Sequence, residues 1–182
     1  VIIDEADRLA ALVDGILRAG GAPRPEEINL HRITEHVAHL IEAEKPAGVE
    51  LVRDYDPSLP SITVDRNHMI QAFLNLGRNA MHALGLKGRL IFRTRALTNF
   101  AVGGERHRLV LSAEVEDNGP GIPEELKETI FFPLVTGRAT GTGLGLTIAQ
   151  DLVSRNGGLI EFTSEPGRTI FQIRLPVANG AR

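Results

Sequence analysis

The segment 141–146, with the sequence GTGLGL, is the part of this chain best suited to bind a phosphorylated ligand. It is a glycine-rich turn that leads directly into the apolar stretch 146–155, which has helical spacing. The first turn of a helix carries unpaired N–H groups and a partial positive charge, so it attracts phosphates. Glycines also let the backbone approach a ligand closely. Taken alone, the segment is equally compatible with an ordinary turn before a helix.

Two asparagines, Asn75 and Asn79, lie one helical turn apart in the stretch 66–84. With His82 they align on one face of the predicted helix. An amide oxygen can coordinate Mg²⁺, which takes hard oxygen ligands and keeps waters and substrate phosphates as the others. Hydrogen bonding to a neighbouring loop is the alternative, and both interpretations stay open from this segment alone. The core face of the helix is predicted to consist of Ile70, Phe73, Leu74, Gly77, Met81 and Leu84.

A third segment, 117–121 with the sequence DNGPG, comes after a strand-like run rich in Val and Leu. Such a sequence is a common turn. A carboxylate at a strand end, here Asp117, can also accept a hydrogen bond from an exocyclic amine such as adenine N6. In that interpretation Gly119 and Gly121 leave room for a flat base.

The elements that must position these residues are predicted from hydrophobic periodicity and turn signals. Helices are predicted at 29–45, 66–84 and 143–155, with Asn29 and Asp65 as N-caps of the first two. Strands are predicted at 49–55, 61–64, 88–98, 107–116, 158–163 and 169–175. Residues 118–142 are predicted to form a lid around a short helical stretch at 124–131. This order predicts an α/β fold, a two-layer α+β sandwich with helices on one face of a mixed sheet.

The N-terminal stretch 1–19 has a heptad-like seam that is wider than a two-stranded coiled coil needs. We expect it to pack in a helical bundle; a helix folded onto its own domain is the alternative. Residues 20–25 are rich in Gly and Pro and are predicted to be a linker. We therefore divide the chain into a helical stub, 1–22, and one domain, 23–182. Because it begins with Val1 inside a helical pattern, the chain is expected to be a piece of a longer protein.

The composition narrows the class of protein. A length of 182 residues suits a single domain with an appendage. The net charge of −3 gives no reason to expect a nucleic-acid partner. The chain has no cysteine, which excludes disulfides and thiolate zinc sites and favours a cytoplasmic location. No apolar run reaches the ~20 residues of a membrane span, so no membrane contact is expected within these residues.

Five ordered segments resemble the N, G1, F, G2 and G3 boxes of one family. They are NLGRNA at 75–80, DNGPG at 117–121, FFPL at 131–134, GTGLGL at 141–146 and GRTIF at 167–171. Together they resemble the ATP-binding catalytic domain of sensor histidine kinases, a Bergerat-type fold of the GHKL superfamily. The resemblance covers about residues 28–176. Residues 130–137 and 160–167 are most similar to nitrogen-regulation, NtrB-type kinases.

This resemblance implies a role for each matching residue. Asp117 would bind adenine N6 with Thr169 nearby, Asn79 would ligate Mg²⁺, and Asn75 would hydrogen-bond a phosphate. The backbone N–H groups of 143–146 would hold the triphosphate of ATP. The implied ATP site consists of Asn75, Asn79, Asp117, Gly119, Gly121, Gly141, Thr142, Gly143, Leu144, Gly145, Leu146 and Thr169.

Two further residues complete the expected catalytic group, which is Asn75, His82 and Arg138. His82 stands where many relatives carry a lysine near the γ-phosphate, and a neutral imidazole would hold a phosphate more weakly. Arg138, in the predicted lid, is the preferred cation for the γ-phosphate; its alternative is a solvated loop arginine.

The residue types also indicate the kind of reaction. ATP-hydrolysing branches of the superfamily place a glutamate where this chain has Asn75, and an amide cannot act as a general base near neutral pH. We therefore expect transfer of the γ-phosphoryl group to a protein histidine rather than hydrolysis. None of the six histidines is followed by the acid expected of an acceptor, so the acceptor is expected upstream of Val1. Residues 1–22 would then be the end of the dimerisation and phosphoacceptor hairpin.

The resemblance also implies partners. These are the dimerisation and phosphoacceptor domain of the same protein, which is expected to be a homodimer, an NtrC-like response regulator and a small PII-type adaptor. Two alternatives remain: a GHKL-type ATPase, and a non-catalytic domain that senses nucleotide. A Rossmann or P-loop protein is disfavoured, because segment 141–146 lacks the third glycine of the former and has no Gly-Lys-Ser/Thr after it.

Overall fold

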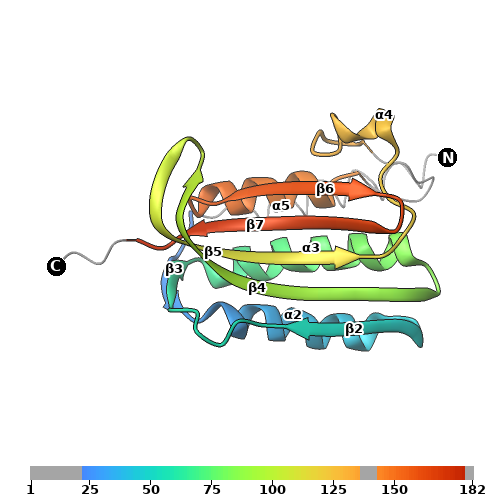
Figure 1. Cartoon of the computed structure of the whole chain (residues 1–182), viewed down its shortest axis with the longest axis horizontal. Coiled ribbons are helices and arrows are strands. Elements are labelled where there is room, and N and C mark those ends of the chain that lie inside the picture. The colour runs from blue at the N-terminus through green and yellow to red at the C-terminus, as the bar shows by residue number, and fades with distance from the viewer. Residues whose placement is uncertain (1–21, 136–142, 179–182) are drawn as a thin grey trace.

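The computed structural model describes residues 22–135 and 143–178. Three helices, α2 (Leu30–Glu44), α3 (Arg66–Leu84) and α5 (Gly145–Arg155), form one layer against a five-stranded sheet (Figure 1). The strands of this sheet are β2 (Gly48–Asp54), β4 (Lys87–Val102), β5 (Glu105–Asp117), β6 (Leu159–Glu165) and β7 (Arg168–Pro176). Their order is β2-β4-β5-β7-β6, with β2 and β4 parallel and the other neighbours antiparallel.

Smaller elements complete the described part of the chain. The short strands β1 (Glu26–Ile28) and β3 (Ile62–Val64) pair antiparallel in a sheet of their own. One turn of helix, α4 (Glu124–Lys127), lies within segment 118–142, which the sequence predicts to be a lid. The mixed sheet with helices on one face agrees with the prediction from the sequence.

The helix α3 has the bounds that the sequence predicts, because both of its ends carry strong local signals. Asp65 caps the start, and its Oδ1 accepts a hydrogen bond from the N–H of His68 at 3.0 Å. Gly85 ends the helix with φ 67°, and its N–H donates to the carbonyl of Met81. In α2, Asn29 caps the first turn in the same way, as predicted.

The core face of α3 is wider than predicted. Phe73, Gly77 and Met81 are buried as expected, but Ile70, Leu74 and Leu84 are only partly buried. The reason is that α3 is the central helix and packs on α2, on α5 and on the sheet together. A prediction that assumes one contact surface therefore omits some of the residues that α3 buries. The additional buried residues are His68, Met69, Ala72, Leu76 and Ala80.

Other elements differ from the prediction mainly in length. β1 was not predicted, since three residues are too few to show an alternating pattern. β4 and β5 extend to a tight turn at Gly103 and Gly104, so the hairpin is longer than 88–98 and 107–116. α4 covers four residues where 124–131 was expected. The predicted helix 1–19 and residues 20–21 of the predicted linker lie outside the described residues.

The sheet face opposite the helices carries an ion-pair network centred on Arg93. The guanidinium group contacts Asp54 at 2.8 Å, Glu116 at 2.7 Å and Glu114 at 3.2 Å. Hydrogen bonds from Arg93 and then Arg95 lower the pKa of Asp54. Since these acids and bases are paired with each other, their charges largely offset one another on this face.

Candidate nucleotide-binding site

The predicted site residues that the structure describes gather at one end of the helix layer. α3 and α5 run antiparallel: the N–H of Asp65, before α3, donates to Asn156 Oδ1, after α5, at 2.7 Å. The opposite end brings together the second half of α3, the start of α5, the end of β5 and the start of β7 (Figure 1). Segments far apart in the sequence thus meet where the glycine-rich turns lie.

Asn75 connects α3 to the start of α5. Its side-chain amide donates a hydrogen bond to the carbonyl oxygen of Gly145 at 3.1 Å. This contact places Asn75 against segment 143–146, and it is a hydrogen bond to a neighbouring segment of the kind that the alternative interpretation expects. It also accounts for one N–H of the Asn75 amide, which leaves the second N–H and the carbonyl oxygen for other partners.

The start of α5 is well suited to an anion. Its N-cap is Leu144, whose side chain has no hydrogen-bond acceptor, and its first turn has no acidic residue. The N–H groups of this turn are therefore not satisfied by its own side chains. Gly143 has φ 65°, and a Cβ atom there would lie 2.5 Å from the carbonyl carbon of Leu134. Only glycine fits this position, where the Leu134 N–H donates to the Gly143 carbonyl at 3.1 Å.

Asp117 and Thr169 lie at the end of β5 and the start of β7. Both are nearly buried, with 3% and 4% of their surface exposed, and they are direct partners across β5 and β7. Asp117 Oδ1 accepts the N–H of Gly119 at 2.9 Å. A buried carboxylate beside a hydroxyl can recognise an exocyclic amine and a ring nitrogen of a base.

The loop after Asp117 lies on the turn between β6 and β7. The Gly167 N–H donates to the Gly119 carbonyl at 2.9 Å, and the Ile122 N–H donates to Ser164 Oγ at 2.8 Å. Gly121 has φ 88°, and a Cβ atom there would lie 2.9 Å from the Glu165 carbonyl oxygen. Sequence reasoning missed Ser164, although a polar residue on the inward-facing side of β6 was a usable signal.

The remaining predicted residues lie on α3 or outside the described part of the chain. Asn79 is half-buried one turn after Asn75, on the same side of α3. His82 is exposed in the last turn of α3. Its proposed contact with the γ-phosphate stays a prediction. Arg138, Gly141 and Thr142 lie outside the described residues.

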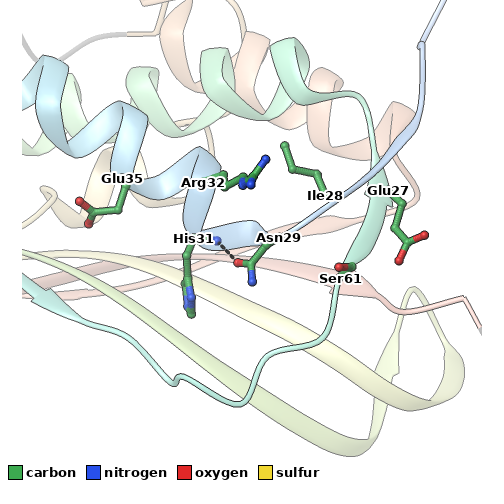
Figure 2. A pocket seen from close by; sticks show the side chains of 7 residues that line it. All are labelled: Glu27, Ile28, Asn29, His31, Arg32, Glu35 and Ser61. Atoms are coloured by element: carbon green, nitrogen blue, oxygen red, sulfur yellow. Dashed lines mark hydrogen bonds between the residues drawn. The ribbon is translucent and has the colours of Figure 1, made fainter.

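A cavity of about 610 Å³ lies elsewhere, beside β1 and the start of α2 (Figure 2). Its size is within the usual range for small-molecule sites. Its lining mixes Glu27 and Glu35 with Arg32, and it contains none of the predicted site residues. The side chain of His31 points from this region toward the sheet, stacks on Tyr55 at 5.0 Å and contacts Thr94 Oγ1 at 2.9 Å. Two acids at its edge make this cavity a poor seat for a triphosphate.

Comparison with known proteins decides the family. The family of histidine kinase-, DNA gyrase B- and HSP90-like ATPases matches residues 64–179, which contain all of the predicted ATP-site residues. The chain belongs to this family. The sensory histidine kinase/phosphatase NtrB of Escherichia coli O157:H7 is 47% identical over 178 residues, covering 97% of this chain and 51% of that protein. The NtrB of Rhodobacter capsulatus is 40% identical over 191 residues, covering 98% and 52%.

Solved structures of the same ATPase family agree with the fold. The nucleotide-free catalytic domain of histidine kinase ThkA aligns with a TM-score of 0.73 and 28% identity, covering 85% of this chain and 96% of that one. ThkA in complex with the response regulator protein TrrA aligns with a TM-score of 0.75 and 26% identity, covering 100% and 51%. The predicted fold class and the predicted resemblance to NtrB-type histidine kinase catalytic domains are confirmed.

The length of this chain differs from that of its curated relatives. The chain spans about half the length of the curated relatives it matches. Among the residues that the structure describes, no helix is both long enough and apolar enough to cross a membrane.

Proposed function

We propose that this chain is the ATP-binding catalytic domain of an NtrB-type sensor histidine kinase. It transfers the γ-phosphoryl group of ATP to a histidine outside residues 1–182, for relay to a response regulator in nitrogen regulation. The observation that carries the proposal is the hydrogen bond from Asn75 to the Gly145 carbonyl. It joins the two segments that are proposed to bind the phosphates, and Asn75 is a neutral amide where a hydrolytic relative has a carboxylate.

Each part of the proposed site has its own role in binding ATP. Asp117 accepts the adenine N6 amine, and Thr169 lies beside it at the base. Gly119 and Gly121 keep the loop close to the β6–β7 turn and leave the base its space. The N–H groups of 143–146 bind the phosphates, since the first turn of α5 has no acidic side chain to compete for them. Gly141, Thr142 and Arg138 complete this side of the proposed site.

A magnesium ion fits the donors present only as an ion shared with the nucleotide. No group of three or more His, Cys, Asp or Glu side chains among the described residues could hold a metal by itself. Asn79 is the residue that would hold the ion, through its amide oxygen, with phosphates and waters as the other ligands. When bound, the ion neutralises phosphate charge; the chain's own contribution is to orient that amide on α3.

The proposed reaction needs positioning more than covalent help from this domain. A nitrogen of the acceptor histidine forms a bond to the γ-phosphorus as the bond from that phosphorus to the β–γ bridging oxygen breaks, and ADP leaves. Asn75 cannot take a proton from water, so water is not activated as a competing nucleophile. The dipole of α5 and the cation proposed at Arg138 offset the charge on the phosphates.

The wider assembly is part of the same proposal. Residues 1–22 belong to the dimerisation and phosphoacceptor hairpin of a cytoplasmic homodimer, and residues 23–182 form the catalytic domain. An NtrC-like response regulator and a PII-type adaptor are the proposed partners. The response regulator is supported by the ThkA structure, which holds the regulator TrrA, and the nitrogen-regulation role by the identity with NtrB proteins.

Calorimetry with a non-hydrolysable ATP analogue, with and without Mg²⁺ and beside the GTP analogue, tests the nucleotide site. We expect binding that depends on magnesium and favours adenine; absent or unselective binding would refute the site. Phosphotransfer is then tested with a dimerisation domain supplied as acceptor. Binding without transfer would indicate a nucleotide sensor, and ATP turnover without any acceptor would indicate an ATPase.

A further inference from the structure

Ser164 sits at the end of a polar row that crosses three strands. Its direct partner on β7 is Thr169, whose direct partner on β5 is Asp117. The next row on the same face is apolar, with Phe162 stacked on Phe171 at a ring distance of 5.7 Å. The hydroxyl oxygens of Ser164 and Thr169 are 2.8 Å apart, which makes them hydrogen-bonded. The polar row is thus a continuous feature at the adenine end of the site.

The Ser164 hydroxyl also holds the loop after Asp117. It accepts the Ile122 N–H at 2.8 Å, which uses one lone pair and leaves one hydrogen and one lone pair. When Ser164 donates to Thr169 Oγ1, the single hydroxyl hydrogen of Thr169 is left for the base.

We propose that Ser164 is a positioning residue that makes this site selective for adenine over guanine. Adenine presents a donor at N6 and an acceptor at N1, whereas guanine presents an acceptor at O6 and a donor at N1. Asp117 as acceptor and Thr169 as donor match adenine and oppose guanine, and Ser164 fixes that donor direction while anchoring the loop. This inference rests on the proposed function, because it assumes that Asp117 and Thr169 bind the base.

The test compares the affinities of non-hydrolysable ATP and GTP analogues for the intact chain and its variants. Ser164→Ala removes the bridge, and we expect the preference for the ATP analogue to fall about tenfold, the size of a lost buried hydrogen bond. Ser164→Thr keeps the hydroxyl and should restore most of the preference. Thr163→Ala is the matched control, because Thr163 is the adjacent residue on the opposite, exposed face of β6.

A double variant separates positioning from general destabilisation. In a Thr169→Val background the donor is absent, so Ser164→Ala should no longer change the ATP-to-GTP ratio. A Ser164→Ala variant that keeps the full preference, or loses affinity for both analogues equally, would overturn the inference while leaving the proposed function intact. A wild-type chain with no adenine preference would overturn both. If Ser164→Ala folds poorly, Ser164→Cys keeps the volume with a weaker hydrogen-bonding group and should lower the preference in the same way.

Discussion

The side-chain amide of Asn75 is hydrogen-bonded to the backbone carbonyl of Gly145, 70 residues further along the chain. This bond joins two helices at the place where their sequences are least typical of helices: an asparagine inside α3 and a glycine at the start of α5. Because the phosphates are proposed to lie at this junction, small shifts of one helix against the other should alter nucleotide binding more than they alter the fold.

Gly143→Ala should abolish binding of the ATP analogue. The new methyl group would lie 2.5 Å from the carbonyl carbon of Leu134 in a backbone conformation with φ 65°, so the start of α5 must move. Gly157→Ala is the matched control: φ is 74°, but no described atom lies within 4 Å of the new methyl group. That control should cost about 1 kcal/mol of unfolding free energy and leave affinity unchanged. Equal affinities of the two variants in calorimetry would argue against a phosphate site here.

Asp117→Asn should weaken ATP binding by about tenfold to a hundredfold and GTP binding much less. The asparagine keeps an oxygen for the Gly119 N–H, so the loop should hold its shape. The substitution replaces the other carboxylate oxygen, an acceptor, with an NH₂ group, a donor that repels the adenine amine. Competition between the two analogues for one labelled nucleotide measures this ratio directly. If the ratio stays at its wild-type value, Asp117 does not bind the base.

Asn79→Ala should remove the magnesium dependence of nucleotide binding. The wild-type chain is expected to bind the ATP analogue more tightly with Mg²⁺ than with EDTA, because the amide oxygen would ligate the shared ion. In the variant the two affinities should converge. Asn67→Ala, an exposed asparagine at the start of the same helix, is the control and should behave like the wild type. A variant that still distinguishes Mg²⁺ from EDTA would exclude Asn79 as the ligand.

Asp65 should make the stability of the domain sensitive to acid. Burial alone would raise its pKa, but the N–H groups of Arg24 and His68 outweigh burial, and the pKa of Asp65 is lowered. A lowered pKa stabilises the fold above the unfolded value, near 3.9, and this stabilisation is lost as pH falls through the folded value.

The matched variant for this prediction is Asp65→Asn, which caps a helix about as well but does not titrate. Urea unfolding from pH 7 to pH 3 should show the wild type more stable at neutral pH, with the difference shrinking on acidification. Other acids with lowered pKa values, such as Asp54, are present in both proteins and cancel in the comparison. A difference that does not change with pH would show that the Asp65 carboxylate makes no titratable contribution.

Much of this fold is encoded in local signals of the sequence. α3 begins and ends where predicted because Asp65 caps it and Gly85 adopts a left-handed conformation. Asp117 and the glycine segments could be chosen from their residue types and order. The sequence could not predict that these segments meet in space, because their meeting depends on the antiparallel packing of α3 on α5.

What the sequence did not reveal depends on register between strands. Ser164 belongs to the proposed site only because β6 and β7 pair it with Thr169. β1 exists only because β3 is there to pair with it. α3 buries more of its surface than predicted because it packs on α2, α5 and the sheet, and the periodicity of one helix does not show how many neighbours it has.

The parallel pairing of β2 with β4 has a consequence for how the domain opens. The hairpins β4–β5 and β6–β7 close over turns of two residues, whereas β2 can pair only after β3 and α3 have crossed the layer. Closures of this length are slow to form, and β2 is also an edge strand with one neighbour, whereas β5 has two. Native-state hydrogen exchange should therefore find the amides of β2 less protected than those of β5. Since Asn75, Asn79, Asp117 and Thr169 all lie on other elements, this edge can unfold locally while a nucleotide stays bound.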